Sequence, residues 1–143
     1  MTLPIYGQTV NNIPAAKKLI KKATENQLLA AAILWHKSLV DQVLVGQRSG
    51  RIYPVPKAIN KKYQASAPGE PPARRTGAMA GDYKPRVRET AEGTIGEVGS
   101  TFEYAQWMET GTSKIAKRPH LKPAYMLNQT AILAALVKDW KLE

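Results

Sequence analysis

The chain has 143 residues and a net charge of +10, from 21 basic and 11 acidic residues, and it contains no cysteine. This length fits one domain, residues 1–143, with a core of its own, and the lack of cysteine excludes disulfides and thiolate metal sites. Residues 1–12 lack the pattern of a signal peptide and the longest apolar run, residues 28–35, is too short to cross a membrane, so we expect a soluble, non-secreted protein without a membrane partner.

Residues 13–45 are predicted to form one long helix, because Pro14 suits a first helical turn and Gly46 suits the position after the last one. Its apolar residues recur at helical spacing and predict one buried stripe. The stripe consists of Ile20, Leu28, Ala32, Trp35, Leu39 and Val43. We expect Trp35 in the core, with an interface position as the alternative.

Residues 46–75 are rich in glycine and proline, which break regular elements, and predict an extended loop that could be flexible. Residues 51–55 are predicted to be a short extended piece, with Pro54 at an edge. The basic residues of this loop are Arg48, Arg51, Lys57, Lys61, Lys62, Arg74 and Arg75, against Glu70 alone. Such a loop could order only on contact with a neighbouring subunit.

Residues 76–80 are predicted to form a short helical turn capped by Thr76. Two strands follow near residues 83–90 and 94–99, and the turn between them predicts an antiparallel hairpin. Ile95 and Val98 break the strict period of two, and a bulge at Gly96 would account for this.

A short helix is predicted over residues 102–109, capped by Ser100 or Thr101 and ended by Gly111. We expect Phe102, Ala105 and either Met108 or Trp107 to pack inward from it. A basic loop follows over residues 113–122, with Lys114, Lys117, Arg118 and Lys122.

A last helix is predicted from Pro123 to residue 140. Its expected buried face consists of Met126, Thr130, Leu133, Leu136, Val137 and Trp140. This order of elements predicts an α+β fold, in which the long N-terminal helix and the C-terminal helix pack on a small antiparallel sheet.

Positive charge is concentrated in the two basic loops and near the start of the long helix. The helix cluster consists of Lys17, Lys18, Lys21 and Lys22. Such charge attracts DNA or an acidic protein surface. A lysine-rich soluble surface is the alternative, with equal weight for each cluster.

The sequence predicts no catalytic, metal or cofactor site. His36 and His120 without cysteine do not make a zinc site. Ser100, His120 and Asp82 form a Ser–His–Asp set only on paper, since nothing in the sequence places them together. Carboxylates are too scattered for a metal-dependent nuclease, and the glycine spacing fits no phosphate-binding fingerprint. We therefore expect a protein that is not an enzyme and uses no cofactor.

Several segments, in this order, resemble a family of tailed-bacteriophage neck proteins, the tail-completion or head–tail joining proteins of long-tailed phages. They are Ala65-Ser66-Ala67-Pro68-Gly69-Glu70-Pro71-Pro72, Arg75-Thr76-Gly77-Ala78-Met79, Val98-Gly99-Ser100, Tyr104-Ala105, Met108-Glu109-Thr110-Gly111-Thr112 and Arg118-Pro119-His120-Leu121-Lys122-Pro123-Ala124. The match spans roughly residues 51–137. The chain departs from the family pattern at Met79, Thr110 and His120, where the family commonly has leucine, an aromatic or hydrophobic residue, and phenylalanine.

The resemblance implies a non-enzymatic virion protein, assembled in the host bacterial cytoplasm. Its subunits would form a ring, a hexamer as the family implies, at the head-proximal end of the tail, with an axial channel for DNA. The fold would be a twisted antiparallel sheet packed on the long helix. The implied partners are other copies of the chain, a neck or head-completion protein, a tail-tube or tail-terminator protein, and packaged DNA in transient, nonspecific contact.

The expected interface or DNA-channel residues are cations of the two basic loops together with Glu109. They are Arg48, Arg51, Lys57, Lys61, Lys62, Arg74, Arg75, Glu109, Lys114, Lys117 and Arg118. We expect Tyr104, Trp107 and Met108 in the core of the subunit rather than in an interface. Whether Glu109 and Arg118 act within one subunit or between two stays open.

Two other functions remain as alternatives. A stand-alone basic module that binds DNA without sequence preference would show tight, salt-sensitive binding to duplex DNA. A hydrolase or nuclease is disfavoured, because the chain lacks the clustered side chains that such chemistry needs.

Overall fold

The computed structural model describes residues 13–138, which form an α+β fold with two small antiparallel sheets. In chain order the elements are α1 (Ile13–Ser38), the π-helical turn η1 (Leu39–Val43), β1 (Ile52–Pro54), β2 (Lys62–Gln64), α2 (Ala78–Asp82), β3 (Lys84–Thr90), β4 (Gly93–Gly99), α3 (Glu103–Thr110), α4 (Leu121–Leu127) and α5 (Gln129–Leu136). The predicted α+β class is confirmed, with two two-stranded sheets in place of one.

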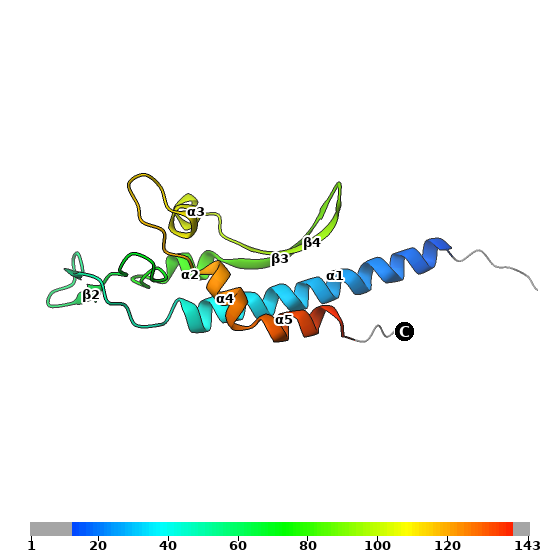
Figure 1. Ribbon diagram of the computed structural model, residues 1–143, viewed down its shortest axis with the longest axis horizontal. Coiled ribbons are helices and arrows are strands. Elements are labelled where there is room, and N and C mark those ends of the chain that lie inside the picture. The colour runs from blue at the N-terminus through cyan, green and yellow to red at the C-terminus, as the bar shows by residue number, and fades with distance from the viewer. Residues whose placement is uncertain (1–12, 139–143) are drawn as a thin grey trace, which may run out of the picture.

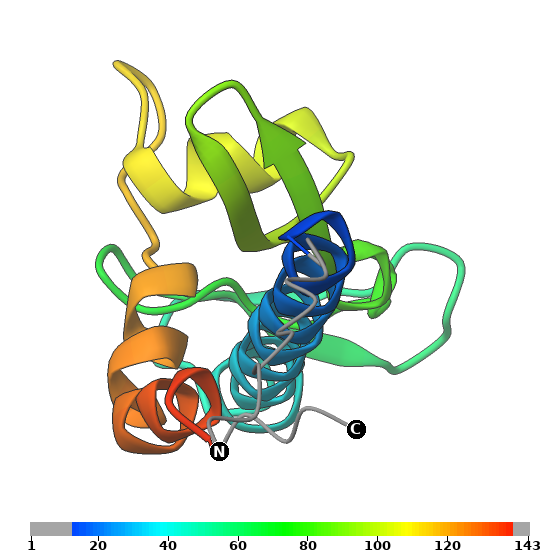
Figure 2. The same ribbon diagram turned by 90° about the vertical axis from the view of Figure 1, so that its right-hand side faces the viewer.

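The long helix α1 is the central element (Figure 1). The β3–β4 hairpin lies along one side of it and α4 and α5 lie along another, as the view along the helix shows (Figure 2). The strands β1 and β2 lie at one end of the molecule, beyond the C-terminal end of η1 (Figure 1). Among residues 13–138, no helix has the length and apolar character that a membrane crossing requires.

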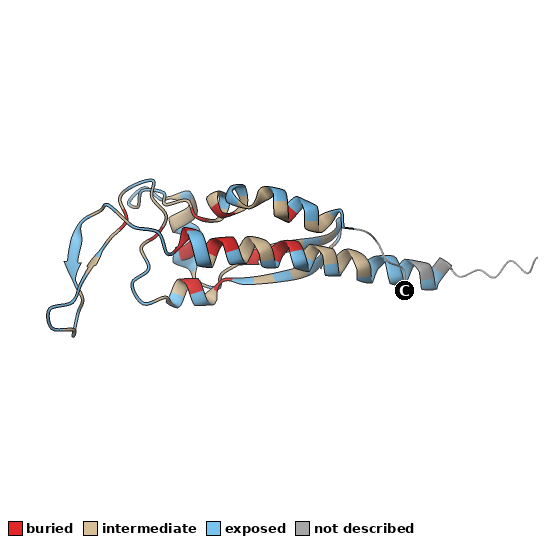
Figure 3. Ribbon diagram, turned by 90° about the horizontal axis from the view of Figure 1, so that it is seen from below, coloured by how far each residue is buried: buried red, intermediate tan, exposed pale blue. Residues whose placement is uncertain are grey.

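The predicted long helix is confirmed as α1 continued by η1. The amide of Leu44 donates to the carbonyl of Leu39, five residues back, at 2.9 Å, and this bond makes the last turn π-helical. The buried stripe is confirmed at Ala32, Leu39 and Val43. It is wrong at Ile20, which is 49% exposed, because the first turns of α1 extend past the elements that cover its other half (Figure 3).

Side chains of the long helix tie it to α4. The indole nitrogen of Trp35 donates to the carbonyl of Leu121 at 2.9 Å, and the hydroxyl of Ser38 donates to the carbonyl of Ala124 at 2.8 Å. Ser38 and Ala124 are buried, so this bond satisfies two polar groups that would otherwise be costly to bury. The core around it comprises Ala32, Leu39, Val43, Leu44, Ala80, Tyr83, Val98, Ala105 and Ala124.

The antiparallel hairpin predicted after residue 83 is confirmed as β3 and β4, but the predicted bulge at Gly96 is wrong. The pairing runs without interruption from Lys84 opposite Gly99 to Thr90 opposite Gly93. Gly96 instead lies where the strand meets α1, because a Cβ atom there would be 2.9 Å from the carbonyl oxygen of Leu28. Val98 is buried on this face and Ile95 is exposed on the other.

Replacing Gly96 with alanine is expected to lower the free energy of unfolding by about 1–3 kcal/mol, because strand and helix must move apart. Urea unfolding followed by circular dichroism measures this change. Gly81→Ala is the matched control, since a Cβ at Gly81 meets no heavy atom within 4 Å, and it should be neutral or stabilising by up to about 1 kcal/mol. Equal effects of the two substitutions would contradict the close approach at Gly96.

The prediction of one C-terminal helix from Pro123 is wrong in its start and its continuity. Two helices, α4 and α5, are separated at Asn128, whose φ is −123°. Asparagine competes with helical backbone bonding, which favours such a break. The predicted buried face is also wrong, because the break turns Ala124 and Ile132 toward the core and leaves Met126, Thr130, Leu133 and Val137 exposed. The predicted Trp140 lies outside the described residues.

The predicted cap at Thr76 is confirmed as a hydrogen bond, because the Thr76 hydroxyl accepts from the amide of Ala78 at 3.3 Å. Gly77, whose φ is +82°, lies between them at the N-cap position of α2. The predicted cap of α3 is wrong, because α3 begins at Glu103 without a side-chain cap, and Ser100 and Thr101 bind the carboxylate of Asp82 through hydroxyl bonds of 2.5 and 2.8 Å. These bonds join the end of α2 to the approach of α3. The predicted end of α3 at Gly111 is confirmed, with φ at +79°.

Candidate functional site

The β1–β2 hairpin combines aromatic rings with cations. Tyr53 and Tyr63 are opposite each other in the two strands, and their rings stack with centroids 5.7 Å apart. The guanidinium carbon of Arg51 lies 5.5 Å from the Tyr53 ring centre, and that of Arg75 lies 5.6 Å from the Tyr63 ring centre. Both distances suit cation–π contacts. The hairpin therefore presents two guanidinium groups beside a pair of stacked tyrosines.

Backbone bonds close the base of this hairpin. The amide of Gly50 donates to the carbonyl of Ala65, and the amide of Ala65 donates to the carbonyl of Arg51, both at 2.9 Å. A Cβ atom at Gly50 would lie 2.5 Å from the Ala65 oxygen, so glycine is required there. The extended piece predicted at residues 51–55 is confirmed as β1. Its partner strand β2 was not predicted from the sequence. In the turn that connects the two strands, Ile59 is 91% exposed.

Glu70 fastens the loop internally. Its carboxylate accepts hydrogen bonds from the hydroxyl of Ser49, from the Ser49 amide at 3.0 Å and from the Ala67 amide at 2.9 Å. These bonds, led by that of the Ser49 hydroxyl, lower the pKa of Glu70 to about 2. The described chain thus supplies bonds of its own that hold residues 49–70 together, and the hypothesis that the loop orders only against a neighbouring subunit stays a prediction.

Replacing Glu70 with glutamine should speed amide hydrogen exchange at Ser49 and Ala67, because a neutral amide oxygen is a weaker acceptor than a carboxylate. Exchange measured by NMR or mass spectrometry gives the result directly. Glu92→Gln, at the exposed turn between β3 and β4, removes the same charge elsewhere and should leave these amides unchanged. Equal exchange in both variants would show that Glu70 does not hold the loop.

Arg48 lies at the junction between the long helix and this loop. Its guanidinium donates to the carbonyls of Val43 at 2.8 Å, Gly46 at 2.7 Å and Pro72 at 3.1 Å. Val43 is the last residue of η1, where backbone acceptors lack helical partners, and Gly46 follows in the turn after it. Arg48 was predicted as an interface or channel residue, and its donors are occupied within the chain.

The two basic loops predicted from the sequence contact each other. The amide of Gly69 donates to the carbonyl of Lys117 at 3.1 Å, and the guanidinium of Arg118 donates to the carbonyl of Ser66 at 3.3 Å. The Arg118 amide also donates to the carbonyl of Met108 at 2.5 Å. Arg118 therefore joins the 113–122 loop to α3 and to the proline-rich segment.

The remaining predicted cations are exposed. They are Arg51, Lys57, Lys61, Lys62, Arg74, Arg75, Lys114 and Lys117. Within residues 13–138, none of them belongs to an ion pair. Their charge is therefore available to a partner at this end of the molecule.

Glu109 caps α4 from a distance. Its carboxylate accepts hydrogen bonds from the amides of His120 at 2.7 Å, Leu121 at 3.0 Å and Lys122 at 3.2 Å. It also lies 3.0 Å from the His120 Nδ1 atom. Burial alone would raise the pKa of Glu109, but the bonds from the His120 ring and the three amides outweigh it and lower the pKa to about 2. Glu109 thus acts within the subunit, and Arg118 is not its ion-pair partner in the described chain.

His120 is fully buried beneath this cap. Its Nδ1 atom faces two acceptors, the carbonyl of Arg118 at 2.9 Å and the Glu109 carboxylate, and so carries a hydrogen. Its Nε2 atom lies 2.5 Å from the hydroxyl of Tyr83. The pKa of Tyr83 is raised, first by burial and then by the charges of Glu109 and Asp82. His120 is therefore a buried residue whose ring contacts Tyr83, Glu109 and the main chain of Arg118.

The set of Ser100, His120 and Asp82 has a different geometry from a catalytic relay. Ser100 donates directly to Asp82, and the His120 ring contacts Tyr83, Glu109 and the main chain. In a relay the imidazole would lie between the hydroxyl and the carboxylate.

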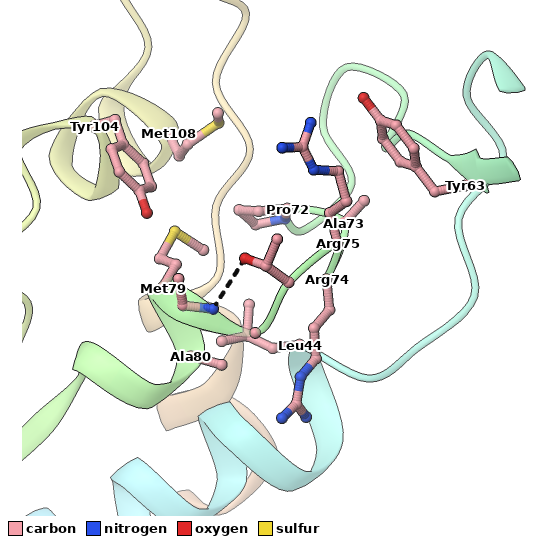
Figure 4. Close-up of a pocket in the computed structure, with 13 residues that line it drawn as sticks. Leu44, Tyr63, Pro72, Ala73, Arg74, Arg75, Met79, Ala80, Tyr104 and Met108 are labelled. Carbon is pink, nitrogen blue, oxygen red and sulfur yellow. Dashed lines mark hydrogen bonds between the residues drawn. The ribbon is translucent and has the colours of Figure 1, made fainter. Parts of the chain in front are cut away.

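A pocket of about 380 Å³ lies between α3 and the segment that connects β2 to α2. Met79, Tyr104 and Met108 point into it, and Arg75 lies at its mouth beside Tyr63 (Figure 4). Tyr104 is 38% exposed and the neighbouring Trp107 is 43% exposed. The prediction that these two aromatic residues belong to the core is wrong, because Ala105 and Glu109 form the inward face of α3. Met108, which was predicted in the core together with Tyr104 and Trp107, is half-buried.

The open face of the β3–β4 sheet adds a second basic surface that was not predicted as a site. Arg86, opposite Glu97 in the register, and Arg88, two residues further along β3, lie on it at 2.5 and 3.3 Å from the Glu97 carboxylate oxygens. Bonds from Arg88 and Arg86 lower the pKa of Glu97. The alternation of Lys84, Arg86 and Arg88 along the strand was the sequence signal for this face.

The chemistry of the site is thus that of binding surfaces: exposed cations, stacked tyrosines and a partly apolar pocket. Across the part of the chain that the structure describes, no three His, Cys, Asp or Glu side chains are grouped to hold a metal ion. Searches for similarity found no matching family model, curated protein or solved structure.

Proposed function

We propose that this chain is a structural, non-enzymatic protein of the neck of a tailed bacteriophage. Copies of it form a ring at the head-proximal end of the tail, join the tail to the head and leave a channel through which DNA passes. The protein assembles in the host bacterial cytoplasm and becomes part of the virion. The resemblance of its ordered motifs to tail-completion and head–tail joining proteins supports this role.

The observation that carries the proposal is the β1–β2 end of the molecule. Eight exposed cations without an ion-pair partner in residues 13–138 lie in the hairpin and the adjoining loops. In an isolated subunit such concentrated like charge favours solubility but destabilises the compact state through self-repulsion. A subunit that contacts DNA phosphates or an acidic protein surface gains affinity from it.

Exposed apolar side chains support assembly. Trp107, Tyr104 and Ile59 are exposed by 43%, 38% and 91%, and large aromatic residues at a surface favour protein contacts. Subunits of a closed ring meet head-to-tail through two different surfaces. The other partners are a neck or head-completion protein and a tail-tube or tail-terminator protein, and no cofactor takes part.

A joining assay tests this function. Tails and filled heads from particles that lack the chain should combine into infectious phage when the purified protein is added, and the protein should form rings alone or on the tail. A chain that stays monomeric on tails and restores no infectivity would overturn the proposal.

A stand-alone DNA-binding module is the second candidate, favoured by the arrangement of Arg51, Tyr53, Tyr63 and Arg75. It requires tight binding to free duplex DNA with a steep salt dependence. A gel shift at low salt decides the matter, because the absence of binding there removes this candidate while leaving the neck role intact.

A further inference from the structure

On the basis of the ring proposed above, we infer that the outer face of α3 in one copy docks into the pocket between α3 and residues 72–80 of the next copy. Trp107 enters the pocket, and Glu103 pairs with Arg75 at its mouth. We call Glu103 and Trp107 on the outer face of α3 the knob. The contact is head-to-tail, because the knob and the pocket are different surfaces of the same chain.

The pocket is built to receive an apolar group. Its inner wall is formed by Leu44, Met79, Ala80 and Met108, with Tyr104 at its side (Figure 4). Methionine side chains adapt to the shape of an incoming group. A volume of about 380 Å³ falls within the range of roughly 300–1,000 Å³ for binding pockets. An indole ring fits within this volume and is apolar enough to pack against such a wall.

The charge at the mouth selects the occupant. Arg75 lies there without an ion-pair partner in residues 13–138, and none of the thirteen residues that line the pocket is acidic. An incoming apolar group therefore fits best with a carboxylate beside it. The exposed Ile59 of another copy fits poorly, because Lys57 and Lys61 in the same turn would meet Arg75.

The outer face of α3 has the required pairing of groups. A helix turns about 100° per residue, so Glu103 and Trp107, four residues apart, share one face. Both are exposed. Tyr104 and Met108 lie on the adjacent face, toward the pocket, and Ala105 is buried. Each α3 can thus give its outer face to one neighbour while forming the pocket wall for the other.

Sedimentation of the full chain tests the contact. Trp107→Ala should weaken self-association by at least about ten-fold, as expected for a central aromatic residue. Leu133→Ala, at a side chain exposed by 45% on α5, is the matched control and should change it by less than about two-fold. An equal effect of both substitutions would contradict the inference, as would no effect of Trp107→Ala.

A charge exchange provides a test that does not depend on loss of a large side chain. Arg75→Glu and Glu103→Arg should each weaken association, and the double variant should restore it, because the pair is rebuilt in reverse. Failure of the double variant to recover would overturn the pairing. A mixture of Trp107→Ala and Arg75→Glu chains should stop at two copies, since one intact knob meets one intact pocket.

The chain has no native cysteine, so chemical cross-linking can place the two surfaces. A chain with Gln106→Cys on α3 and Arg74→Cys at the pocket, both exposed, keeps Glu103, Arg75 and Trp107. It should give ladders of linked copies with a short bis-maleimide, and a chain with either change alone should not extend beyond dimers. A monomeric chain without such ladders would overturn this contact. The joining assay separates that result from failure of the neck function, because the ring could then form through other surfaces.

Discussion

Replacing Glu109 with alanine is expected to lower the free energy of unfolding by about 2–4 kcal/mol. The substitution removes the acceptor for three amides at the start of α4 and for the buried His120 ring. The freed amides lie at a helix start, where no carbonyl replaces the lost acceptor. Urea unfolding at neutral pH, followed by circular dichroism, measures the loss.

Glu103→Ala provides the control on the same helix. Glu103 is exposed in the first turn of α3, so its removal should cost no more than about 0.5–1 kcal/mol. A loss at Glu109 as small as that at Glu103 would contradict its role as the remote cap of α4.

The same residue sets a pH dependence. The pKa of Glu109 is about 2 in the folded chain against an ordinary value of 4.5. The unfolded chain therefore binds more protons between these values, and stability falls as the pH drops from about 4.5 toward 2. Above 4.5 the full contribution is present. In Glu109→Gln this loss should be smaller than in the unchanged chain, and an identical acid profile would contradict the assignment.

Removing three charges from the hairpin is expected to have the largest effect on function. A chain with Lys57→Gln, Lys61→Gln and Lys62→Gln should join heads to tails at least about ten-fold less well, equivalent to about 1.4 kcal/mol of lost interaction. These lysines are exposed and belong to no ion pair of the described residues, so unfolding should be unaffected. Infectious particles formed in the joining assay are the readout.

The matched control removes three charges from the other end of the molecule. Lys17, Lys18 and Lys22 are exposed on the first turns of α1, and their replacement by glutamine should leave joining within about two-fold of the unchanged chain. Equal losses in both triple variants would show that net charge, rather than the hairpin, governs joining. If the hairpin lysines touch phosphates, each one removed should also reduce the salt slope of DNA binding by about 0.9.

Elements set by local periodicity or a single turn residue were predictable from the sequence. The long helix, the β3–β4 hairpin and the end of α3 at Gly111 follow from such signals. The break at Asn128 and the strand β2 do not, because each depends on packing or pairing with distant residues. Gly96 shows the same limit, because glycine is required there by the close approach of α1 and not by the geometry of the strand.

The site was predictable in its charge but not in its contacts. The sequence indicated which cations cluster, and most of them are exposed. It could not show that Arg48 and Arg118 bond to carbonyls of their own chain, because those partners are brought close only by the fold. It also could not separate Trp107 from the core, since the inward face of α3 is determined by what lies against it.

Cryo-electron microscopy of phage particles assembled in cells that make this chain is the most direct test of its role in the neck. We predict a ring of copies at the head-proximal end of the tail, with density that fits α1 and the β3–β4 hairpin and an open channel at the centre. Particles whose neck and tail hold no such density, and whose purified virions lack the chain by mass spectrometry, would contradict the proposed function.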